Sequence, residues 1–297
     1  MYRTPTARII LDSLHPNGTD RLTTMEVKLH RFVLAEFNTH RVFSRNSASS
    51  RAIPLAKQIE TVLTNPAFPI CWPKEQKGMQ GGEELSEAWQ DEAEYTWHQA
   101  RDAAVDLARV LGQQIGVHKS VASRLLEPFM WQTIIVTSTE WTNFFQLRCS
   151  PMAQPEIRAA AEAMQAALTA STPIPLAYGE WHLPFVTGYD ADRLGAADPA
   201  DVLPADTPLD FGPTDLAKLC SAARCARVSY LTHDTGTRDV GRDLDLALRL
   251  INPGDGAFHA SPFEHVATPV TASYTVLGNF TNFKQFRHEL ESDLENS

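Results

Sequence analysis

The sequence predicts an α+β fold in which helices flank a mainly antiparallel sheet. Residues 24–30 alternate apolar and polar side chains, as a half-buried strand does, and a turn through residues 15–18 joins them to a second strand-like run at 7–11. Residues 83–111 carry large apolar side chains at spacings of three and four, which is the period of a helix. A chain of 297 residues, 43% of them hydrophobic, can bury one large core or two modest ones.

The remaining elements follow from local patterns. Further helices are expected at 55–63, at 117–127, from Pro155 through the small residues 159–167, at 215–228, at 243–251 and at 280–290. Extended chain is expected at 173–186, a strand at 268–276, and loops at 65–82 and 232–242. The β-branched run 131–139 fits both a strand and a buried helix. The apolar stripe of 83–111 is expected to lie in the core.

Residues 187–213 differ in composition from the rest, because they are rich in Asp, Ala, Pro and Gly and poor in large apolar side chains. They are expected to form a linker or a surface excursion. The chain is therefore divided into residues 1–186, a joint at 187–213, and residues 214–297, which together are expected to form one composite domain.

Composition excludes several classes. The net charge of −10 opposes a nonspecific grip on nucleic acid, no run approaches ~20 apolar residues, and the N-terminus lacks the apolar core of a signal peptide. We expect a cytoplasmic protein without a membrane span. Its cysteines form no CxxC pair, so free thiols are expected rather than zinc ligands or disulfides. They are Cys71, Cys149, Cys220 and Cys225.

Residues 39–51 concentrate groups that suit anion binding. The window holds three arginines, several short hydroxyl side chains and His40, with little apolar bulk. Arginine forks and hydroxyls match the geometry of phosphate. A solvated surface loop is the alternative interpretation.

A second polar cluster lies about a hundred residues later. Residues 144–148 read F-F-Q-L-R, and residues 153–157 read A-Q-P-E-I. Together with the first window, this cluster resembles the flavin-dependent thymidylate synthases, which carry R-H-R-x7-S and then F-L-x-L-R followed by A-Q-x-E-I. The leading arginine of the first motif is Thr39 in this chain.

The C-terminal third resembles the N-terminal part of the same family. Residues 226–230 are similar to its A-R-V-S-F segment, and residues 259–265 to its H-x-T-P-F-E-H segment. Residues 285–288 resemble the segment that leads into its R-H-R motif, so the strand and the His-Arg segment occur twice. A circular permutation with 187–213 as the joint, after duplication of that element, accounts for this order.

The resemblance implies a flavin-dependent thymidylate synthase-like fold with a permuted order of elements. It also implies an enzyme that methylates C5 of a pyrimidine deoxynucleotide, most simply dUMP to dTMP. FAD would be the cofactor, with methylene-tetrahydrofolate and NADPH as co-substrates and a homotetramer as the assembly. No metal, membrane or nucleic-acid partner is implied.

The resemblance also implies roles for individual residues. Arg148 would polarise the pyrimidine ring, with a structural ion pair to Glu156 as the alternative, and Cys149 is not expected to act as a nucleophile. The nucleotide ligands would be Ser49, Arg51, Arg124 and Gln154. The flavin ligands would be His40, Arg41, Asn46, Asn143, Ser229, His259, Ser261, Glu264, Arg287 and His288.

Departures from the family pattern leave alternatives open. Arg287 is expected to supply the cation that Thr39 removes. Ser47 stands where the family commonly has glutamate, which leaves dCMP or another C5 modification open. Two rival classes are a catalytically silent nucleotide- or flavin-binding protein and a nucleic-acid contact module, and the acidic net charge opposes the second.

Overall fold

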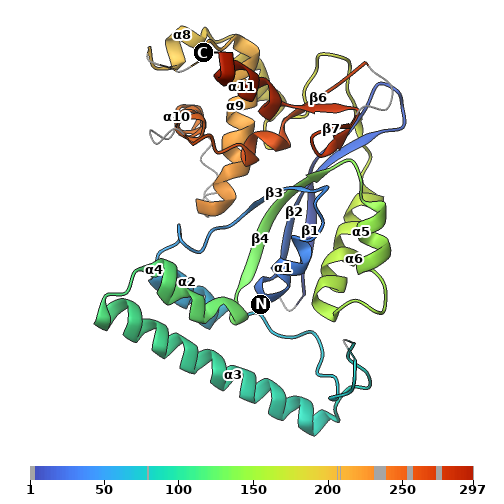
Figure 1. The fold of residues 1–297 in the computed structure, drawn as a ribbon, viewed down its shortest axis with the longest axis vertical. Coiled ribbons are helices and arrows are strands. Elements are labelled where there is room, and N and C mark those ends of the chain that lie inside the picture. Colours follow the sequence, from blue (N-terminus) through green and yellow to red (C-terminus); the bar gives the residue numbers. More distant parts are fainter. Residues whose placement is uncertain are drawn as a thin grey trace.

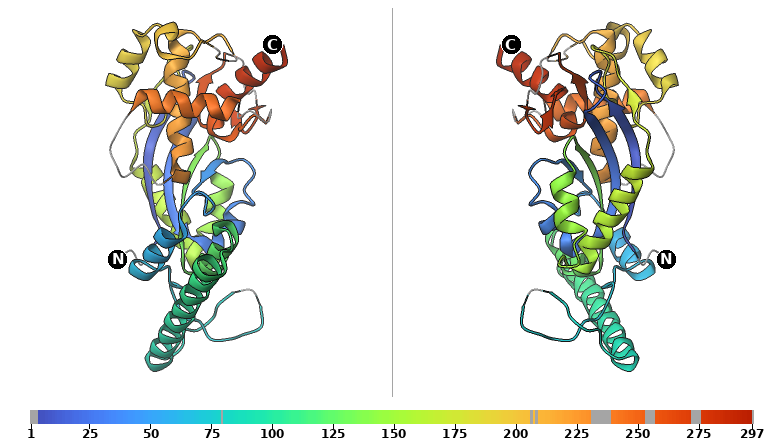
Figure 2. Two further views of the ribbon diagram at one scale, coloured as in Figure 1. Left: turned by 90° about the vertical axis from the view of Figure 1, so that its left-hand side faces the viewer. Right: turned by 90° about the vertical axis from the view of Figure 1, so that its right-hand side faces the viewer.

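The computed structural model describes residues 4–78, 80–205, 207, 209–230, 239–252, 257–271 and 276–296. A twisted sheet occupies the middle of the molecule (Figure 1). The C-terminal part lies at one end of this sheet and a long helix at the other, as both side views also show (Figure 2).

The central sheet has five strands in the order β3-β4-β2-β1-β5. β1 (Thr6–Leu14) and β2 (Arg21–His30) form the predicted antiparallel hairpin, and β4 (Trp131–Ser138) pairs antiparallel with β2. β3 (Ser44–Ser47) is antiparallel to β4, whereas β5 (Ile174–Pro175) is parallel to β1. The prediction of a mainly antiparallel sheet is confirmed, and the ambiguous run after residue 131 is a strand.

Helices cover one face of the sheet. They are η1 (Arg31–Val33), α1 (Leu34–Phe37), α5 (Thr142–Arg148) and α6 (Pro155–Ala170). α6 begins with the proline expected at its first turn, and its buried Ala160 and Ala161 permit close approach to the strands. Met25 and Val136, adjacent in the sheet, and Phe144 of α5 complete this core.

The lower end of the molecule is built from short helices and one long helix. They are α2 (Leu55–Thr64), α3 (Glu87–Arg109), η2 (Val110–Ile115), α4 (Lys119–Ala122) and η3 (Ser123–Phe129). The expected helix at 117–127 is therefore a short α-helix followed by a 3-10 helix.

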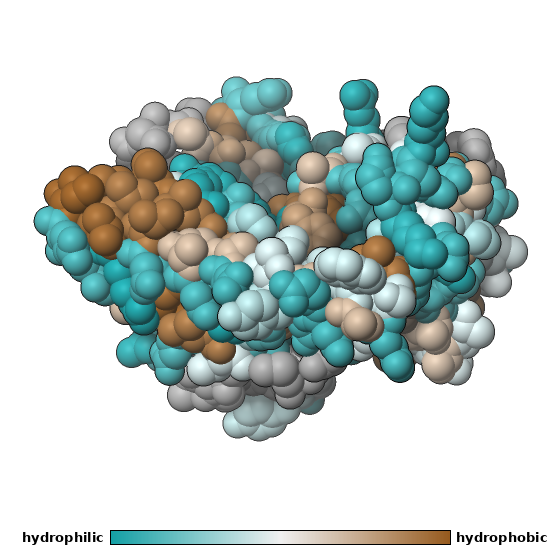
Figure 3. Space-filling view, turned by 90° about the horizontal axis from the view of Figure 1, so that it is seen from below, coloured by the Kyte–Doolittle hydropathy of each residue, from teal (hydrophilic) through white to brown (hydrophobic). Residues whose placement is uncertain are grey.

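The expectation that the whole stripe of 83–111 lies in the core is wrong. Val105 and Ala108 are buried, but Trp89 is 65% exposed and Leu107 58% exposed. The reason is that α3 contacts α2, η3 and the loop around residues 67–72 on one side, while much of its remaining surface is exposed among the described residues. Figure 3 shows hydrophobic side chains gathered at one end of this face. Ile115 and Val121, on the elements that follow α3 in the chain, are also exposed.

The C-terminal part has its own core of helices. Its helices are α7 (Gly188–Gly195), α8 (Pro199–Val202), α9 (Pro213–Ala226), η4 (Arg227–Tyr230), α10 (Val240–Ile251), η6 (Ser261–His265) and α11 (Phe286–Asn296). Its short strands are β6 (Ala267–Pro269), β7 (Val276–Leu277), β8 (Phe280–Thr281) and β9 (Phe283–Gln285).

Two expectations need correction in this part. Residues 187–213 contain α7 and α8, and Leu194 and Phe211 are buried in the C-terminal core, so this segment is more than a linker. Residues 280–285 form strands, and the expected helix begins only at Phe286. The helices expected at 215–228 and 243–251 are confirmed as α9 and α10, whereas most of the expected loop 232–242 lies outside the described residues.

None of the helices in the described part of the chain combines the length and apolar composition that crossing a membrane requires. Across the same residues, no group of three or more His, Cys, Asp or Glu side chains could hold a metal ion. The cysteines are free thiols, with Cys220 and Cys225 buried.

Candidate functional site

The first motif forms a turn that leads into edge strand β3. His40 follows α1, its amide donates to the Phe37 carbonyl, and its own carbonyl accepts from Phe43. The ring of His40 packs edge-on against Phe144 of α5, with centroids 4.8 Å apart. Burial, Arg148 and Arg45 all lower the pKa of His40, so its ring is neutral at pH 7.

Arg148 joins the second motif to the first. It is the last residue of α5, and its Nε–H donates to Nε2 of His40 at 3.0 Å. One terminal nitrogen of Arg148 donates to the Thr39 hydroxyl at 3.3 Å. A neutral histidine and a hydroxyl orient the guanidinium without neutralising its charge.

The alternative ion pair between Arg148 and Glu156 does not form. The carboxylate of Glu156 instead accepts from the Ile70 amide at 2.9 Å and from Gln154 at 3.0 Å. Among the described residues, no carboxylate pairs with Arg148. Burial raises the pKa of the adjacent Cys149 thiol, which disfavours a thiolate there.

The third motif packs directly on β3. Asn46 of β3 lies 2.9 Å from Nε2 of His265 and 3.4 Å from the Ser261 hydroxyl, both in η6. Gln285 donates to the hydroxyl of Ser44, also in β3, at 3.0 Å. Residues far apart in the sequence thus meet on the short edge strand, which lies between the second and third motifs.

Arg287 and His288 of the second His-Arg segment lie on α11. Arg287 donates to Glu264 of η6 at 2.5 Å and to Glu291 at 2.8 Å, and the bond to Glu291 is the main cause that raises the pKa of Arg287. The hydroxyl of Thr39 is meanwhile occupied by Arg148. That Arg287 replaces the cation missing at Thr39 stays a prediction. The two His-Arg segments differ locally, since His40 lies in a turn and Arg287 in a helix.

The expected phosphate ligands lie beyond the far end of β3. Ser49 is half-buried and Arg51 is exposed, and both follow the strand, whereas His40 precedes it. The strand itself, Ser44–Ser47, spans roughly 10 Å and separates the two sets of residues. Within one chain, therefore, the structure joins Arg148 to His40 but not to Ser49 or Arg51.

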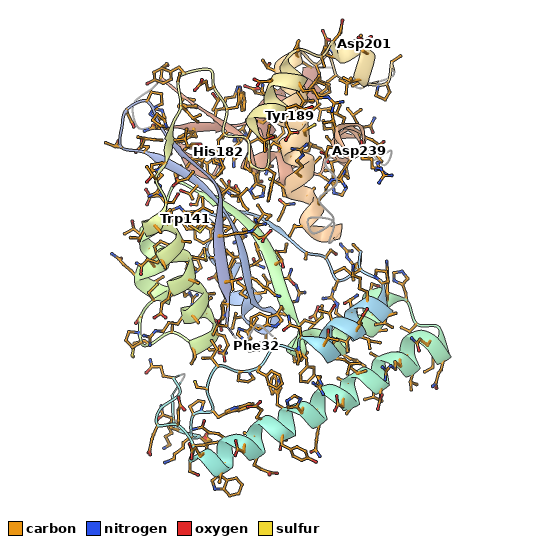
Figure 4. The ribbon with its side chains drawn as sticks, turned by 180° about the vertical axis from the view of Figure 1, so that it is seen from behind. Phe32, Trp141, His182, Tyr189, Asp201 and Asp239 are labelled. Carbon is orange, nitrogen blue, oxygen red and sulfur yellow. The ribbon has the colours of Figure 1, made fainter. Side chains whose placement is uncertain are left out.

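Two cavities lie on the helix-covered side. One of about 510 Å³ is lined by Arg124, Asn38 and Phe32, among others. The second, about 710 Å³, is lined by Gln154, Glu156 and Phe32, among others. They share Phe32, which lies between the sheet and α3 (Figure 4). Exposed Arg124 pairs with Glu127 at 2.6 Å, which leaves its nucleotide role a prediction.

The other predicted ligands are mostly on the surface. Arg41, Asn143 and His259 are exposed. Nε2 of His288 is buried and has no hydrogen-bond partner among the described atoms. The side chain of Ser229 lies outside the described residues.

Two buried histidines have partners that sequence reasoning did not identify. His182 hydrogen-bonds to Ser13 at 2.7 Å and to Thr24 at 2.8 Å, and His265 hydrogen-bonds to Thr137 at 2.7 Å. His265 is the second histidine of the H-x-S-P-F-E-H segment, which is a usable signal. His182 has none, because its partners lie more than 150 residues away in the sequence.

Residues 22–174, just over half of the chain, match the family described as thymidylate synthase complementing protein. No curated protein sequence matches the chain. Similar solved structures include two of the UMP/dUMP methylase PolB from Streptomyces cacaoi. The one bound with 5-Br UMP is 16% identical, with a TM-score of 0.45, over 57% of this chain and 90% of that chain. The one bound with 5-Br dUMP is 14% identical, with a TM-score of 0.45, over 57% of this chain and 91% of that chain.

Proposed function

We propose that this chain, which belongs to the thymidylate synthase complementing protein family, converts dUMP to dTMP with FAD as cofactor and methylene-tetrahydrofolate and NADPH as co-substrates. Membership makes it a flavin-dependent, thymidylate synthase-like methyltransferase. The choice of dUMP, of the carbon donor and of the electron donor is the proposal.

The observation that carries the proposal is the meeting of three motifs around one edge strand. Arg148 contacts His40 in the turn before β3, and Ser261 and His265 contact Asn46 within β3. Among the described residues, Arg148 pairs with no carboxylate. These contacts place its positive charge next to a loop that carries hydroxyl and amide groups. A nucleotide base and a flavin require such groups side by side.

The residues present fit a flavin nucleotide. Arg41, His259 and Ser261 are exposed around β3 and η6, and no carboxylate in the described part of the chain pairs with Arg41. They offer the cation, ring and hydroxyl that a pyrophosphate and an isoalloxazine bind. The buried Nε2 of His288 offers a further polar contact.

Arg148 would act on the pyrimidine. A guanidinium carries a fixed positive charge, so Arg148 would stabilise negative charge that develops on the ring oxygens when C5 becomes nucleophilic. His40 accepts from Nε of Arg148 and Thr39 accepts from one terminal nitrogen, which leaves the other terminal nitrogen for the substrate. Reduced FAD, when bound, supplies hydride, and the folate carries the one-carbon unit.

We propose that Ser49 and Arg51 bind the nucleotide phosphate across a subunit boundary. They follow β3 whereas His40 precedes it, and no hydrogen bond among the described residues joins them to Arg148, which supports a site completed by a second copy. We propose a homotetramer as that assembly, and the exposed apolar end around Ile115 and Val121 supports association.

A second candidate substrate is dCMP. It is favoured by Ser47, which lies half-buried in β3 in place of the glutamate common in the family. A serine presents a different donor and acceptor pattern to the base.

Product mass analysis separates these candidates. The protein with FAD, methylene-tetrahydrofolate and NADPH is incubated with dUMP or with dCMP. We expect a gain of one methyl group on dUMP only. Methylation of dCMP alone would select the second candidate, and an unchanged mass for both nucleotides, with FAD bound, would favour a silent binding protein.

A further inference from the structure

A chain of hydrogen-bonded side chains runs between the central sheet and the C-terminal part, at the level of His182 in Figure 4. From end to end it comprises Ser13, His182, Thr24, Thr137, His265 and Asn46. Every member except Asn46 is at most 1% exposed. Because water does not reach these groups, each hydrogen must be matched within the chain.

The distances are short throughout. The Ser13 hydroxyl lies 2.7 Å from Nδ1 of His182, and Nε2 of that ring lies 2.8 Å from the Thr24 hydroxyl. The hydroxyls of Thr24 and Thr137 are 2.6 Å apart, and that of Thr137 is 2.7 Å from Nδ1 of His265. Nε2 of His265 is 2.9 Å from the Asn46 amide.

Both rings are neutral, so each carries one hydrogen. Burial lowers the pKa of His182 to about 3 and that of His265 to about 3. A neutral imidazole donates from one nitrogen and accepts at the other.

The surroundings of Asn46 decide which end of its amide faces His265. The amide group beside Nε2 of His265 is also 3.1 Å from the Ser261 carbonyl and 3.2 Å from the Arg45 carbonyl. An oxygen there would face two carbonyl oxygens, whereas the amide nitrogen has two hydrogens to donate on this side and cannot accept one from Nε2 of His265. The nitrogen of Asn46 therefore faces His265, and its oxygen lies beside the exposed hydroxyl of Ser261.

That orientation sets every hydrogen along the chain. His265 accepts at Nε2, so its hydrogen is on Nδ1 and is donated to Thr137. Each hydroxyl has one hydrogen, so Thr137 donates to Thr24 and Thr24 donates to Nε2 of His182. The hydrogen of His182 is then on Nδ1 and is donated to Ser13. All hydrogen bonds of this side-chain row therefore point in one direction, from Asn46 toward Ser13, and consecutive bonds strengthen one another.

We infer that His265 is a positioning residue. Anchored by Thr137, it holds the Asn46 amide with its oxygen beside Ser261, where that oxygen accepts a hydrogen bond from an N–H or O–H group of a bound ligand. That this ligand is the flavin cofactor rests on the proposed function. The buried hydrogen-bonded chain thus acts at the surface of the site, in addition to joining two parts of the fold.

Three variants test the role of the chain. Thr137→Val keeps the shape of the side chain but removes the acceptor of the His265 hydrogen, and Thr137→Ser restores a hydroxyl. Thr133→Val, on the same strand, is the control outside the chain. We expect about tenfold weaker FAD binding in Thr137→Val, the size of one hydrogen bond to the ligand, and less than about threefold change in the other two. Equal FAD dissociation constants for Thr137→Val and Thr133→Val, or no rescue by serine, would overturn the positioning role.

A neutron diffraction structure of the deuterated protein tests the polarity independently of any flavin. We expect deuterium on Nδ1 of both His182 and His265 and none on their Nε2 atoms. Deuterium on Nε2 of His265 would refute the inference even if the enzyme is active. If the wild-type protein binds no FAD, the proposed function and the flavin as ligand fail, and the neutron structure alone decides the orientation of Asn46.

Discussion

Arg148 combines a permanent charge with a neutral anchor. His40, whose pKa is lowered by burial and by two arginines, accepts from Nε and leaves the charge uncompensated. An arginine bound to a carboxylate would already have its charge matched. The chemistry of this residue therefore depends on which partner the fold gives it.

Removing this charge should slow the reaction. We expect Arg148→Ala to lower kcat by about 10²–10³-fold, as loss of one group that stabilises transition-state charge does, while FAD stays bound. The kcat of Arg148→Lys should lie between those of the wild-type protein and Arg148→Ala, since lysine keeps the charge but not the Nε donor to His40. The matched control is Arg249→Ala, an exposed arginine that pairs with Asp245 at 2.8 Å. An unchanged kcat in Arg148→Ala would show that Arg148 has no part in the mechanism.

The buried histidines should make stability depend on pH. Each has a folded pKa of about 3, below its usual value of 6.5, so the unfolded chain binds more protons between these limits. Stability is fully present above pH 6.5 and falls as the pH drops toward 3. At pH 5 each buried ring should lower the free energy of unfolding by roughly 2 kcal/mol relative to pH 7.

Urea unfolding at pH 7 and pH 5 measures this loss. His265→Gln should reduce the difference between the two pH values, whereas the exposed control His118→Gln should not. Equal unfolding free energies for the wild-type protein at both pH values would contradict the neutral-histidine assignment.

At the scale of elements, local signals predicted more than long-range ones. The hairpin β1–β2 and helix α6 were readable because alternation and a proline at the first turn act within a few residues. β4 was ambiguous, because only its pairing with β2 and β3 decides the strand. In 187–213 composition suggested a linker, yet the capping box of Thr187 and Asp190 begins α7.

The residues of the candidate site also divide into those that local signals predict and those that they do not. The motifs identified His40, Asn46 and Arg148, which the structure connects to one edge strand. No local pattern marks His182, because its partners are set by the assembled sheet. Burial of the whole α3 stripe is a wrong prediction, because the 3.6-residue period identifies an apolar face but does not show which elements cover it.

A buried arginine joins three helices of the C-terminal part. Arg224 of α9 binds Asp190 of α7 and Asp243 of α10, each at 2.8 Å. Although burial raises the pKa of Asp190, hydrogen bonds from Arg224 and Thr187 lower it to about 2. Arg224→Ala should destabilise the protein by about 3–5 kcal/mol, because it removes the buried positive charge that faces Asp190 and leaves Asp243 with Arg227 alone.

Chemical denaturation measures that cost. The control is Arg242→Ala, whose exposed side chain pairs with Asp239 and should contribute less than about 1 kcal/mol. Similar losses for the two variants would show that the buried cluster does not hold α7, α9 and α10 together.

At the scale of the whole molecule, the exposed end of the long helix predicts association. Ile115 is 65% exposed and Val121 57% exposed, on adjacent elements. Ile115→Glu should shift the molar mass measured by light scattering from that of a tetramer toward smaller species. Tyr189→Glu, a substitution at another exposed site, should not. A wild-type monomer at micromolar concentration would contradict the shared-site proposal.

The order of elements along the chain is compatible with permutation, because segments from both ends of the sequence meet at β3. His265 of η6 and Gln285 of β9, from the C-terminal third, hydrogen-bond to Asn46 and Ser44 of β3 in the N-terminal part (Figure 1). We propose the permutation on that basis, with 187–213 as the joint.

Arg148 and the loop around β3 are proposed to serve one flavin-dependent reaction at C5. The decisive assay is release of tritium from dUMP labelled at C5, measured with FAD, methylene-tetrahydrofolate and NADPH. We expect release that requires added FAD and is lost in Arg148→Ala. Release that continues unchanged in Arg148→Ala, or none from the flavin-loaded wild-type protein with either dUMP or dCMP, would contradict the proposal.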